Sequence, residues 1–266
     1  MNIPWKCMFI SGGASGIGCC LARIGARGGA RVAIFDLRIP AEVRAEFSEL
    51  CGPERCSFHE VDVLQAQALA EAAELAREKL GPPSLAINSA GMQLAKPFLE
   101  LSAEEFDRVI NLNLIGSRNF AAAVLPRMQR GARLALVASL AGLVPSYCYS
   151  AYNASKFGVV GLAGALRMEC LPHGVGVSVV CPPEVLTPMV EEELKTMHPV
   201  TRELKRVAGT LELESAGEEI MTGLVRGHFH VVPGFRARMV WRLNRWFPGL
   251  LELISNRVIL KFGAAE

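Results

Sequence analysis

The chain has 266 residues, 51% of them hydrophobic, which is enough to bury the core of one large domain. Its formal net charge of +2 favours neither a nucleic-acid partner nor a strongly acidic one. Since no apolar run reaches the about 18 residues of a membrane-spanning helix and the first residues do not resemble a secretory signal, we expect a cytoplasmic protein.

The first predicted element is a short apolar strand, Trp5–Ile10, which runs directly into a glycine-rich turn. Glycines at positions 12, 16 and 18 leave room for the backbone to approach a pyrophosphate. The helix predicted from Gly16 to about Gly28 would offer the N–H groups and positive dipole of its first turn to the phosphates. The Gly-x-x-x-Gly-x-Gly spacing therefore predicts a dinucleotide-binding turn.

The second predicted strand, Arg31–Phe35, is followed by an acidic residue, Asp36, about 20 residues after the glycines. A carboxylate there can bind both hydroxyls of an adenosine ribose and would repel a 2′-phosphate, which favours NAD over NADP. Arg38 is the nearby residue that opposes this preference. The alternative interpretation is that Asp36 only caps the segment that follows the strand.

Strands and helices continue to alternate along the chain. Further strands are predicted at Cys56–Val61, Ser84–Ile87, Leu134–Ala138, Val175–Cys181 and His228–Val232. A helix over Leu64–Leu80 stops at Gly81-Pro82-Pro83, and Ser102 with Glu105 forms a capping box for a helix that runs towards Arg127. This alternation predicts an α/β fold with a doubly wound, seven-stranded parallel sheet.

Two predicted elements bring a serine, a tyrosine and a lysine together. Tyr152 and Lys156 are four residues apart, so a helix presents both on one face. A lysine ammonium about 4 Å from the phenol would favour the phenolate by roughly 4 kcal/mol, or about three pKa units. Ser139 follows the strand Leu134–Ala138 at the carboxyl end of the sheet, where open α/β sheets bind ligands. Such a constellation suits proton transfer to and from a carbonyl or alcohol oxygen.

The glycine-rich turn and the Tyr152-x-x-x-Lys156 motif together resemble the short-chain dehydrogenase/reductase family, from about Lys6 to Val232. The resemblance implies a Rossmann-type fold and reversible hydride transfer between NAD(H) and a secondary alcohol or ketone. It implies that Tyr152 is the acid-base, that Lys156 also holds the nicotinamide ribose, and that Ser139 orients the substrate oxygen. It further implies a homo-oligomer, a dimer or tetramer, built on the Tyr152 helix and the long helix before it. The competing interpretation is an NAD(H)-binding sensor or scaffold without turnover.

Asn113 matches the family's Asn-x-x-Gly pattern, which ends here at Gly116. In the family, the backbone carbonyl of this asparagine holds a water that links the lysine to solvent, so Asn113 is the fourth expected catalytic residue. The alternative is a buried helix asparagine that bonds its own backbone.

The resemblance also implies the cofactor site residue by residue. Asp62 matches the family aspartate that bonds the adenine, and Thr187 matches the residue that bonds the carboxamide. Asn88 and Gly91 match the turn beside the adenosine ribose, although Ser89 replaces a family asparagine. The expected cofactor-binding residues are Ser11, Gly12, Ser15, Gly16, Ile17, Gly18, Asp36, Asp62, Val63, Asn88, Ala90, Gly91, Tyr152, Lys156, Pro182, Val185 and Thr187.

The sequence departs from the family pattern where Pro182-Pro183 stands in place of Pro-Gly. Proline fixes φ near −65° and has no N–H, so the loop beside the nicotinamide is expected to be rebuilt if the glycine needs a positive φ. The segment Pro188–Ser215 is predicted to form a mobile lid over the substrate. The expected pocket walls are Gln93, Leu94, Leu140, Val144, Tyr149 and Met189.

The tail, residues 234–266, extends beyond the expected catalytic unit of residues 1–233. Its first predicted helix carries four arginines, and its apolar face is predicted to comprise Phe235, Met239, Val240, Leu243, Trp246 and Phe247. Pro248-Gly249 separates it from a more apolar helix, Leu250–Phe262. Basic and aromatic residues together suit a helix at the inner membrane surface; the alternative is packing on the body or on a partner subunit. Similar tails occur in lipid-ketone reductases of the 3-ketodihydrosphingosine reductase type, which implies a hydrophobic substrate.

The eight cysteines are scattered and are not spaced like metal ligands. Cys7 and Cys181 fall in predicted buried strands, so we expect reduced thiols and no metal site. Cys51 and Cys56 flank Gly52-Pro53 and are close enough to form a disulfide, which is the weaker alternative.

Overall fold

The computed structural model describes residues 3–187 and 197–262. Its centre is a parallel sheet of seven strands in the order β3-β2-β1-β4-β5-β6-β9. The strands are β1 (Cys7–Ser11), β2 (Arg31–Asp36), β3 (Cys56–Glu60), β4 (Leu85–Asn88), β5 (Arg133–Val137), β6 (Gly176–Val180) and β9 (His230–Val231). The strand order reverses between β1 and β4, as in other Rossmann-type sheets, and the predicted fold class is confirmed.

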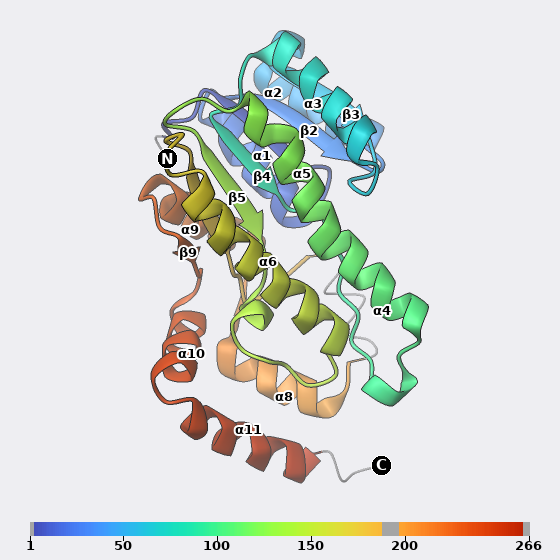
Figure 1. The fold of residues 1–266 in the computed structure, drawn as a ribbon, viewed down its shortest axis with the longest axis vertical. Coiled ribbons are helices and arrows are strands. Elements are labelled where there is room, and N and C mark those ends of the chain that lie inside the picture. The colour runs from blue at the N-terminus through green and yellow to red at the C-terminus, as the bar shows by residue number, and fades with distance from the viewer. Residues whose placement is uncertain (1–2, 188–196, 263–266) are drawn as a thin grey trace.

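Helices cover both faces of this sheet (Figure 1). One face carries α1 (Gly16–Arg27), α2 (Ala41–Cys51) and α9 (Leu213–Val225), and the other carries α3 (Ala66–Leu80), α5 (Gly116–Val124) and α6 (Ser150–Glu169). Because both faces are covered, the inner strands β1, β4, β5 and β6 consist mainly of buried apolar residues. In β1, Cys7 and Phe9 pack into one core, while Met8 and Ile10 pack into the other.

The long helix predicted between Ser102 and Arg127 is present but interrupted. The predicted capping box forms, and the N–H of Glu105 donates to the Ser102 hydroxyl at 3.2 Å. After α4 (Ala103–Ile110), one π-helical turn at Asn111–Ile115 precedes α5. This wider turn contains Asn113, and π-turns in α-helices frequently occur at functional sites.

The predicted lid divides into separate elements. Residues 188–196 lie outside the described residues, so their part of the prediction is not addressed. The rest forms α8 (Pro199–Ala208) and β8 (Thr210–Leu211), which pairs with β7 (Glu184–Val185). The last residues of the predicted lid, from Leu213, instead begin α9 and lie against the sheet, because Ala216 and Ile220 are buried there.

The first tail helix, α10 (Phe235–Trp246), packs on the body of the protein. The face that packs consists of buried Ala237 and half-buried Val240 and Trp241, which contact the core on the α6 side of the sheet. Four residues of the predicted apolar face, Phe235, Met239, Trp246 and Phe247, are exposed, whereas Val240 packs on the body. Small Ala237 allows the close approach, and the residues three and four positions after it lie on the same face.

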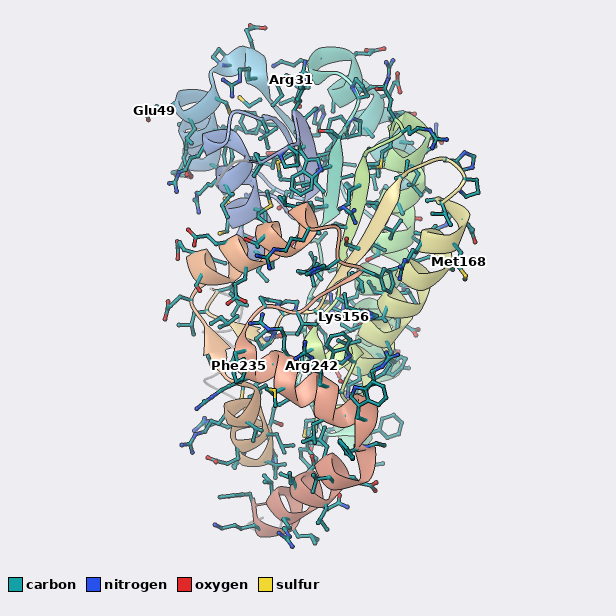
Figure 2. The ribbon with its side chains drawn as sticks, turned by 90° about the vertical axis from the view of Figure 1, so that its left-hand side faces the viewer. Arg31, Glu49, Lys156, Met168, Phe235 and Arg242 are labelled. Atoms are coloured by element: carbon teal, nitrogen blue, oxygen red, sulfur yellow. The ribbon has the colours of Figure 1, made fainter. Side chains whose placement is uncertain are left out.

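The second tail helix, α11 (Pro248–Phe262), lies at the end of the molecule farthest from β3 (Figures 1 and 2). It begins at Pro248, whose fixed φ suits the first position of a helix, so the break falls at Phe247. Within the described ranges, no helix is both long enough and apolar enough to span a bilayer.

All eight cysteines lie within the described residues, and all are free thiols. The Cys51 thiol donates to the Phe47 carbonyl at 3.0 Å, and the Cys56 thiol donates to the Gly52 carbonyl at 3.4 Å. The predicted reduced thiols are confirmed, and the Cys51–Cys56 disulfide alternative is wrong.

Candidate active site

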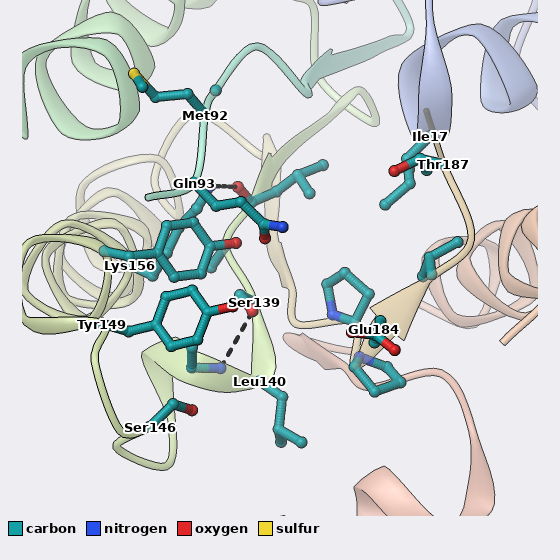
Figure 3. Close-up of a pocket in the computed structure, with 18 of the residues that line it drawn as sticks. Ile17, Met92, Gln93, Ser139, Leu140, Ser146, Tyr149, Lys156, Glu184 and Thr187 are labelled. Carbon is teal, nitrogen blue, oxygen red and sulfur yellow. Dashed lines mark hydrogen bonds between the residues drawn. The ribbon is translucent and has the colours of Figure 1, made fainter. Parts of the chain in front are cut away.

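A cavity of about 430 Å³ lies at the carboxyl ends of the central strands. Doubly wound sheets bind their ligands at this edge, and the volume falls in the range of small-molecule sites. The cavity extends from the turn after β1, past Ser139, Tyr152 and Lys156, to the tail helix α11. Figure 3 shows part of it, with Ile17 and Thr187 together and Ser139 facing Tyr149.

Two glycines close the turn after β1 by backbone contact. Gly12 has a φ of +62°, and a Cβ there would lie 2.6 Å from the amide nitrogen of Ala90. A Cβ on Gly18 would lie 2.1 Å from the carbonyl oxygen of Gly12. Any other residue at either position would force this turn away from α1 or from the turn after β4.

The start of α1 fits a pyrophosphate. Gly16 has a φ of +49° and faces the cavity, where an added Cβ would lie 3.6 Å from the Thr187 methyl carbon. In the described part of the chain, the Ser15 side chain makes no capping bond to α1, and the first helical turn has no acidic residue. Its N–H groups and positive dipole are therefore available to an anion.

Asp36 lines the cavity at the end of β2. Its carboxylate accepts the Ala14 N–H at 2.9 Å and the Leu37 N–H at 2.8 Å. It therefore braces the glycine-rich turn from inside the cavity, while Arg38 is exposed and lies outside the cavity wall. Asp62 and Val63, which follow β3, line the same end.

A buried chain of hydrogen bonds lies behind this wall. The Ser11 hydroxyl donates to Asn88 Oδ1, and these residues are register partners at the ends of β1 and β4. Asn88 Nδ2 donates to the Ser117 hydroxyl at 2.9 Å, which donates to the Asn113 carbonyl at 2.5 Å. All four side chains are buried. Ser11 and Asn88 therefore lie behind the cavity wall and support it, as Gly18 does.

The Asn113 side chain joins the π-turn to the catalytic segment. Its Oδ1 accepts the Met92 N–H at 2.8 Å, and its Nδ2 donates to the Met92 carbonyl at 2.8 Å and to Ser155 Oγ at 2.9 Å. Among the described residues, these partners lie on other segments and not on its own helix backbone, so that alternative is wrong. A Cβ on Gly91 would lie 2.8 Å from Asn113 Oδ1 and 3.4 Å from Lys156 Nζ, so these residues meet closely.

The three side chains predicted to converge do so. Ser139, Tyr152 and Lys156 all line the cavity. Lys156 Nζ lies 5.6 Å from the Tyr152 ring centroid and donates to the Val137 carbonyl, at the end of β5, at 3.1 Å. Ser139 Oγ accepts the Ala141 N–H at 3.2 Å, and this bond fixes the hydroxyl just beyond the carboxyl end of β5 (Figure 3).

Lys156 is only 5% exposed. Burial lowers its pKa to about 8, because the ammonium is separated from water, and the neighbouring Cys181 opposes this shift. A strongly shifted pKa beside a tyrosine and a serine in a cavity is typical of an active site.

Sequence reasoning missed an ion pair beside this constellation. Lys205 Nζ on α8 lies 2.9 Å from Glu184 Oε2 on β7 and 5.3 Å from the Tyr149 ring centroid. Glu184 also accepts the Thr210 hydroxyl at 2.9 Å. The centroids of the Tyr149 and Tyr152 rings are 5.6 Å apart, so the Tyr149 side chain separates the Glu184–Lys205 ion pair from Tyr152. No local spacing in the sequence relates Glu184 to Lys205, so only the fold reveals the pair.

The loop after β6 accommodates both prolines. The Leu140 N–H donates to the Pro182 carbonyl at 2.8 Å, and the chain then forms β7. Among the described residues, Cys148 is the non-glycine residue with a positive φ, so Pro183 does not adopt the conformation that a glycine would allow. Pro182, Val185 and Thr187, three of the expected cofactor-binding residues, line the cavity.

The remaining walls agree in part with the sequence. Gln93, Leu140, Val144 and Tyr149 line the cavity, Leu94 lies outside its wall, and Met189 falls outside the described residues. Four tail residues that sequence reasoning did not assign to the site also line it: Val240, Leu251, Ile254 and Ser255. The spacing of the last three places them on one face of α11, but only the fold shows what that face meets.

A sequence profile of the family described as short chain dehydrogenase matches residues 6–198. The chain belongs to this family. The chain is 32% identical over 237 residues to a protein of Bos taurus named 3-ketodihydrosphingosine reductase, covering 86% of this chain and 71% of that one. It is 37% identical over 244 residues to a 3-dehydrosphinganine reductase of Arabidopsis thaliana, covering 88% and 73%.

Solved structures agree on the fold. A short-chain dehydrogenase of Burkholderia phymatum, solved in complex with NAD, superposes with a TM-score of 0.79 at 23% identity and covers 94% of this dehydrogenase and 96% of that chain. A Brucella melitensis member superposes with a TM-score of 0.76 at 26% identity, covering 87% and 96%. The chain is therefore an NAD(P)-dependent oxidoreductase of this family, and the two relatives above are named as reductases.

Proposed function

We propose that the protein reduces a long-chain lipid ketone, of the 3-ketodihydrosphingosine type, with NADH. The observation that carries this proposal is the shared cavity, in which Ser139, Tyr152 and Lys156 open into a space walled by aliphatic side chains from α8, α10 and α11. Two relatives that cover most of the chain are named for reduction of such a ketone. Tail residues in the cavity wall add the hydrophobic surface that a lipid chain requires.

The proton chemistry follows from the side chains. Tyr152 donates its phenolic proton to the carbonyl oxygen of the ketone, and the Ser139 hydroxyl donates a hydrogen bond that orients this oxygen. Protonated Lys156, buried beside the ring, stabilises the resulting phenolate. Bound NADH supplies the hydride. Met92 and Ser155 hold the Asn113 side chain, and Asn113 fixes the backbone behind Lys156. We propose that the proton lost by Tyr152 is replaced through Lys156 and this backbone.

The cofactor preference rests on Asp36. We propose that its carboxylate faces the adenosine ribose, so that NADH binds more tightly than NADPH. Gly12, Ser15, Gly16, Ile17, Asp62, Val63, Ala90 and Gly91 line the same end of the cavity and would hold the rest of the dinucleotide. Titration calorimetry with both reduced cofactors tests the preference, and Asp36→Ala should narrow the difference in Kd. Tighter binding of NADPH by the wild-type protein would overturn it.

We also propose a peripheral contact of the tail with the inner membrane surface. Residues 234–266 contain six basic and two acidic residues. Phe235, Trp246, Phe247, Leu250 and Leu253 are exposed beside these charges, which suits an anionic interface. Flotation with anionic vesicles should carry the protein and should weaken, without vanishing, as salt is added. Absence of flotation with anionic vesicles at low salt would overturn the proposed membrane contact.

The proposed enzyme is a homo-oligomer, as the family resemblance implies. The exposed apolar side chains of α6, Phe157 and Met168, offer surface for this contact. The alternative of a non-catalytic NAD(H)-binding scaffold rested on Pro183. The loop after β6 accommodates this proline before β7 begins, so Pro183 gives the alternative no support.

The decisive experiment is an assay of NADH absorbance with a panel of acyl, steroid and sphingoid ketones dispersed in mixed micelles. We expect 3-ketodihydrosphingosine to give the highest kcat/KM. A higher value for a steroid or a short acyl ketone would replace the proposed substrate class but keep the chemistry. Absence of turnover with every ketone and with the corresponding alcohols would overturn the proposal.

A further inference from the structure

The second tail helix contributes a wall to the catalytic cavity. Leu251, Ile254 and Ser255 all line it, and their spacing places them on one face of α11. Leu251 is 8% exposed and is the buried residue of this helix, whereas Ile254 is 37% exposed. Ile254 therefore lies at the rim, where the cavity meets the surface.

Two other helices complete this end of the cavity. Leu204 and Val207 on α8 and Val240 on α10 line it together with the α11 face. Figures 1 and 2 both show α11 farther from the sheet than α8, so this end is distant from β5 and Ser139. These neighbouring side chains are aliphatic, while the charged Glu184–Lys205 pair lies near the tyrosines.

The tail is also fixed to the catalytic loop. Asn244 Nδ2 on α10 donates to the Leu143 carbonyl at 3.0 Å. Leu143 is next to Val144, which lines the cavity. The far wall is therefore held in a defined position relative to Ser139, as a subsite needs if it is to select among substrates.

From this arrangement we infer that α11 binds the alkyl chain of the substrate and sets the chain-length preference of the enzyme. The inference rests on the proposed reduction of a lipid ketone and adds the residues that recognise the chain. An alkyl chain is the ligand that matches aliphatic walls beyond a polar reacting centre, because each buried methylene contributes about 0.8 kcal/mol. Ile254, at the rim, is where the end of a long chain would leave the cavity.

The test uses straight-chain methyl ketones from butanone to hexadecanone with NADH. For the wild-type protein, kcat/KM should rise about fourfold per methylene over part of the series, which is 0.8 kcal/mol expressed as a rate ratio. It should level off once the chain passes Ile254. A flat profile would overturn the inference.

Matched variants on α11 locate the effect. Ser255→Phe would fill the cavity, and we expect it to lower kcat/KM for the long ketones by about tenfold or more, while butanone changes by less than about twofold. Asn256→Phe adds the same ring at an exposed neighbouring position outside the cavity wall and should match the wild type. Equal losses for short and long ketones, or equal behaviour of the two variants, would contradict the inference.

A second pair of variants tests the same wall in case Ser255→Phe does not fold. Ile254→Ala removes the rim side chain and should lower kcat/KM for the long ketones several-fold, whereas Leu253→Ala on the outer face should not. Both residues are partly exposed, so neither change should unfold the protein. Equal effects of these two variants would also count against α11 as the wall.

The design separates this inference from the proposed function. If 3-ketodihydrosphingosine is not reduced but the methyl ketones show a chain-length dependence that Ser255→Phe removes, the sphingoid substrate fails and the α11 wall stands. If no ketone is reduced, fluorescence of bound cis-parinaric acid replaces turnover: wild type and Asn256→Phe should bind it, and Ser255→Phe should bind it at least several-fold more weakly. Equal binding by all three proteins would overturn the wall.

Discussion

The two ends of the cavity are built in different ways. At the dinucleotide end, backbone packs directly against backbone: Gly12 contacts Ala90, and Gly18 contacts Gly12. At the substrate end, side chains from distant segments meet, as in the Glu184–Lys205 pair and the wall formed by α11. At Gly12 and Gly18 the first end has no room for a methyl group, whereas the second end can change its side chains without a change of fold. A fixed cofactor and a variable substrate call for this division.

Tyr152 lies where the two ends of the cavity meet. Its substitution has the largest expected effect, and that effect falls on the chemical step alone. Tyr152→Phe removes the proton donor and should lower kcat by roughly 10² to 10⁴. The NADH Kd and the free energy of unfolding should stay close to those of the wild type, because the ring is kept. Stopped-flow turnover and calorimetry measure the two quantities. Retention of more than about a tenth of wild-type kcat would show that another group supplies the proton.

A pair of glycine substitutions compares the two ends directly. A Cβ at Gly18 would lie 2.1 Å from a backbone oxygen, so Gly18→Ala should lower the free energy of unfolding by about 2–3 kcal/mol and weaken NADH binding. Gly249, in the first turn of α11, has open space around it, with nothing within 4 Å among the described residues. Gly249→Ala should leave stability unchanged or raise it by up to about 1 kcal/mol. Urea unfolding with and without NADH measures both, and equal responses would contradict the comparison.

The same difference explains which features could be predicted from the sequence. The glycines, Asp36 and the Tyr152–Lys156 pair each belong to one turn, strand end or helix, so local spacing is enough to identify them. The seven strands follow from apolar runs between turn signals, because buried parallel strands are apolar on both faces. The capping box at Ser102 is likewise local.

The features that could not be predicted depend on contacts between distant segments. The sequence predicts an apolar face for α10 but not which residues pack on the body, because the burial of Ala237 in place of Phe235 depends on the surface against which the helix packs. The π-turn around Asn113 arises where Met92 and Ser155 bond one side chain. Glu184 and Lys205 meet because α8 folds over β7, and α11 lines the cavity because α10 leads it there.

Ion pairs at the two ends provide a finer comparison. Glu184→Gln leaves the Lys205 ammonium without its carboxylate beside the cavity, and should lower stability by about 1–2 kcal/mol. It should also raise the KM for the lipid ketone, because α8 loses a link to β7, while the NADH Kd is unchanged. Glu46→Gln, which breaks the 2.5 Å pair with Arg23 between α1 and α2, is the control. It should lower stability by less than about 1 kcal/mol and leave the ketone KM unaltered. A KM that responds equally to both changes would show that the Glu184–Lys205 pair has no special place at the substrate end.

The smallest expected effect concerns the proton on Lys156, which lies between the two ends. Burial lowers its pKa to about 8, from 10.5 in the unfolded chain. Below pH 8 both states are protonated and the cost of the buried charge is fully present; between pH 8 and 10.5 the unfolded chain binds more protons, so stability rises with pH. Raising the pH from 7 to 9 should therefore favour the wild type over Lys156→Met by about 1 kcal/mol.

The comparison with Lys156→Met is needed because the cysteines act in the opposite direction. Burial raises the pKa of Cys7, Cys20 and Cys51 to about 11, so their unfolded thiols ionise first and stability falls as the pH approaches and passes 9. These contributions are shared by both proteins and cancel in the difference. Urea unfolding at several pH values between 7 and 9 measures it in the absence of cofactor. A difference that does not change with pH would mean that Lys156 keeps its proton throughout, and that the ammonium remains available to a phenolate at Tyr152 over the whole range.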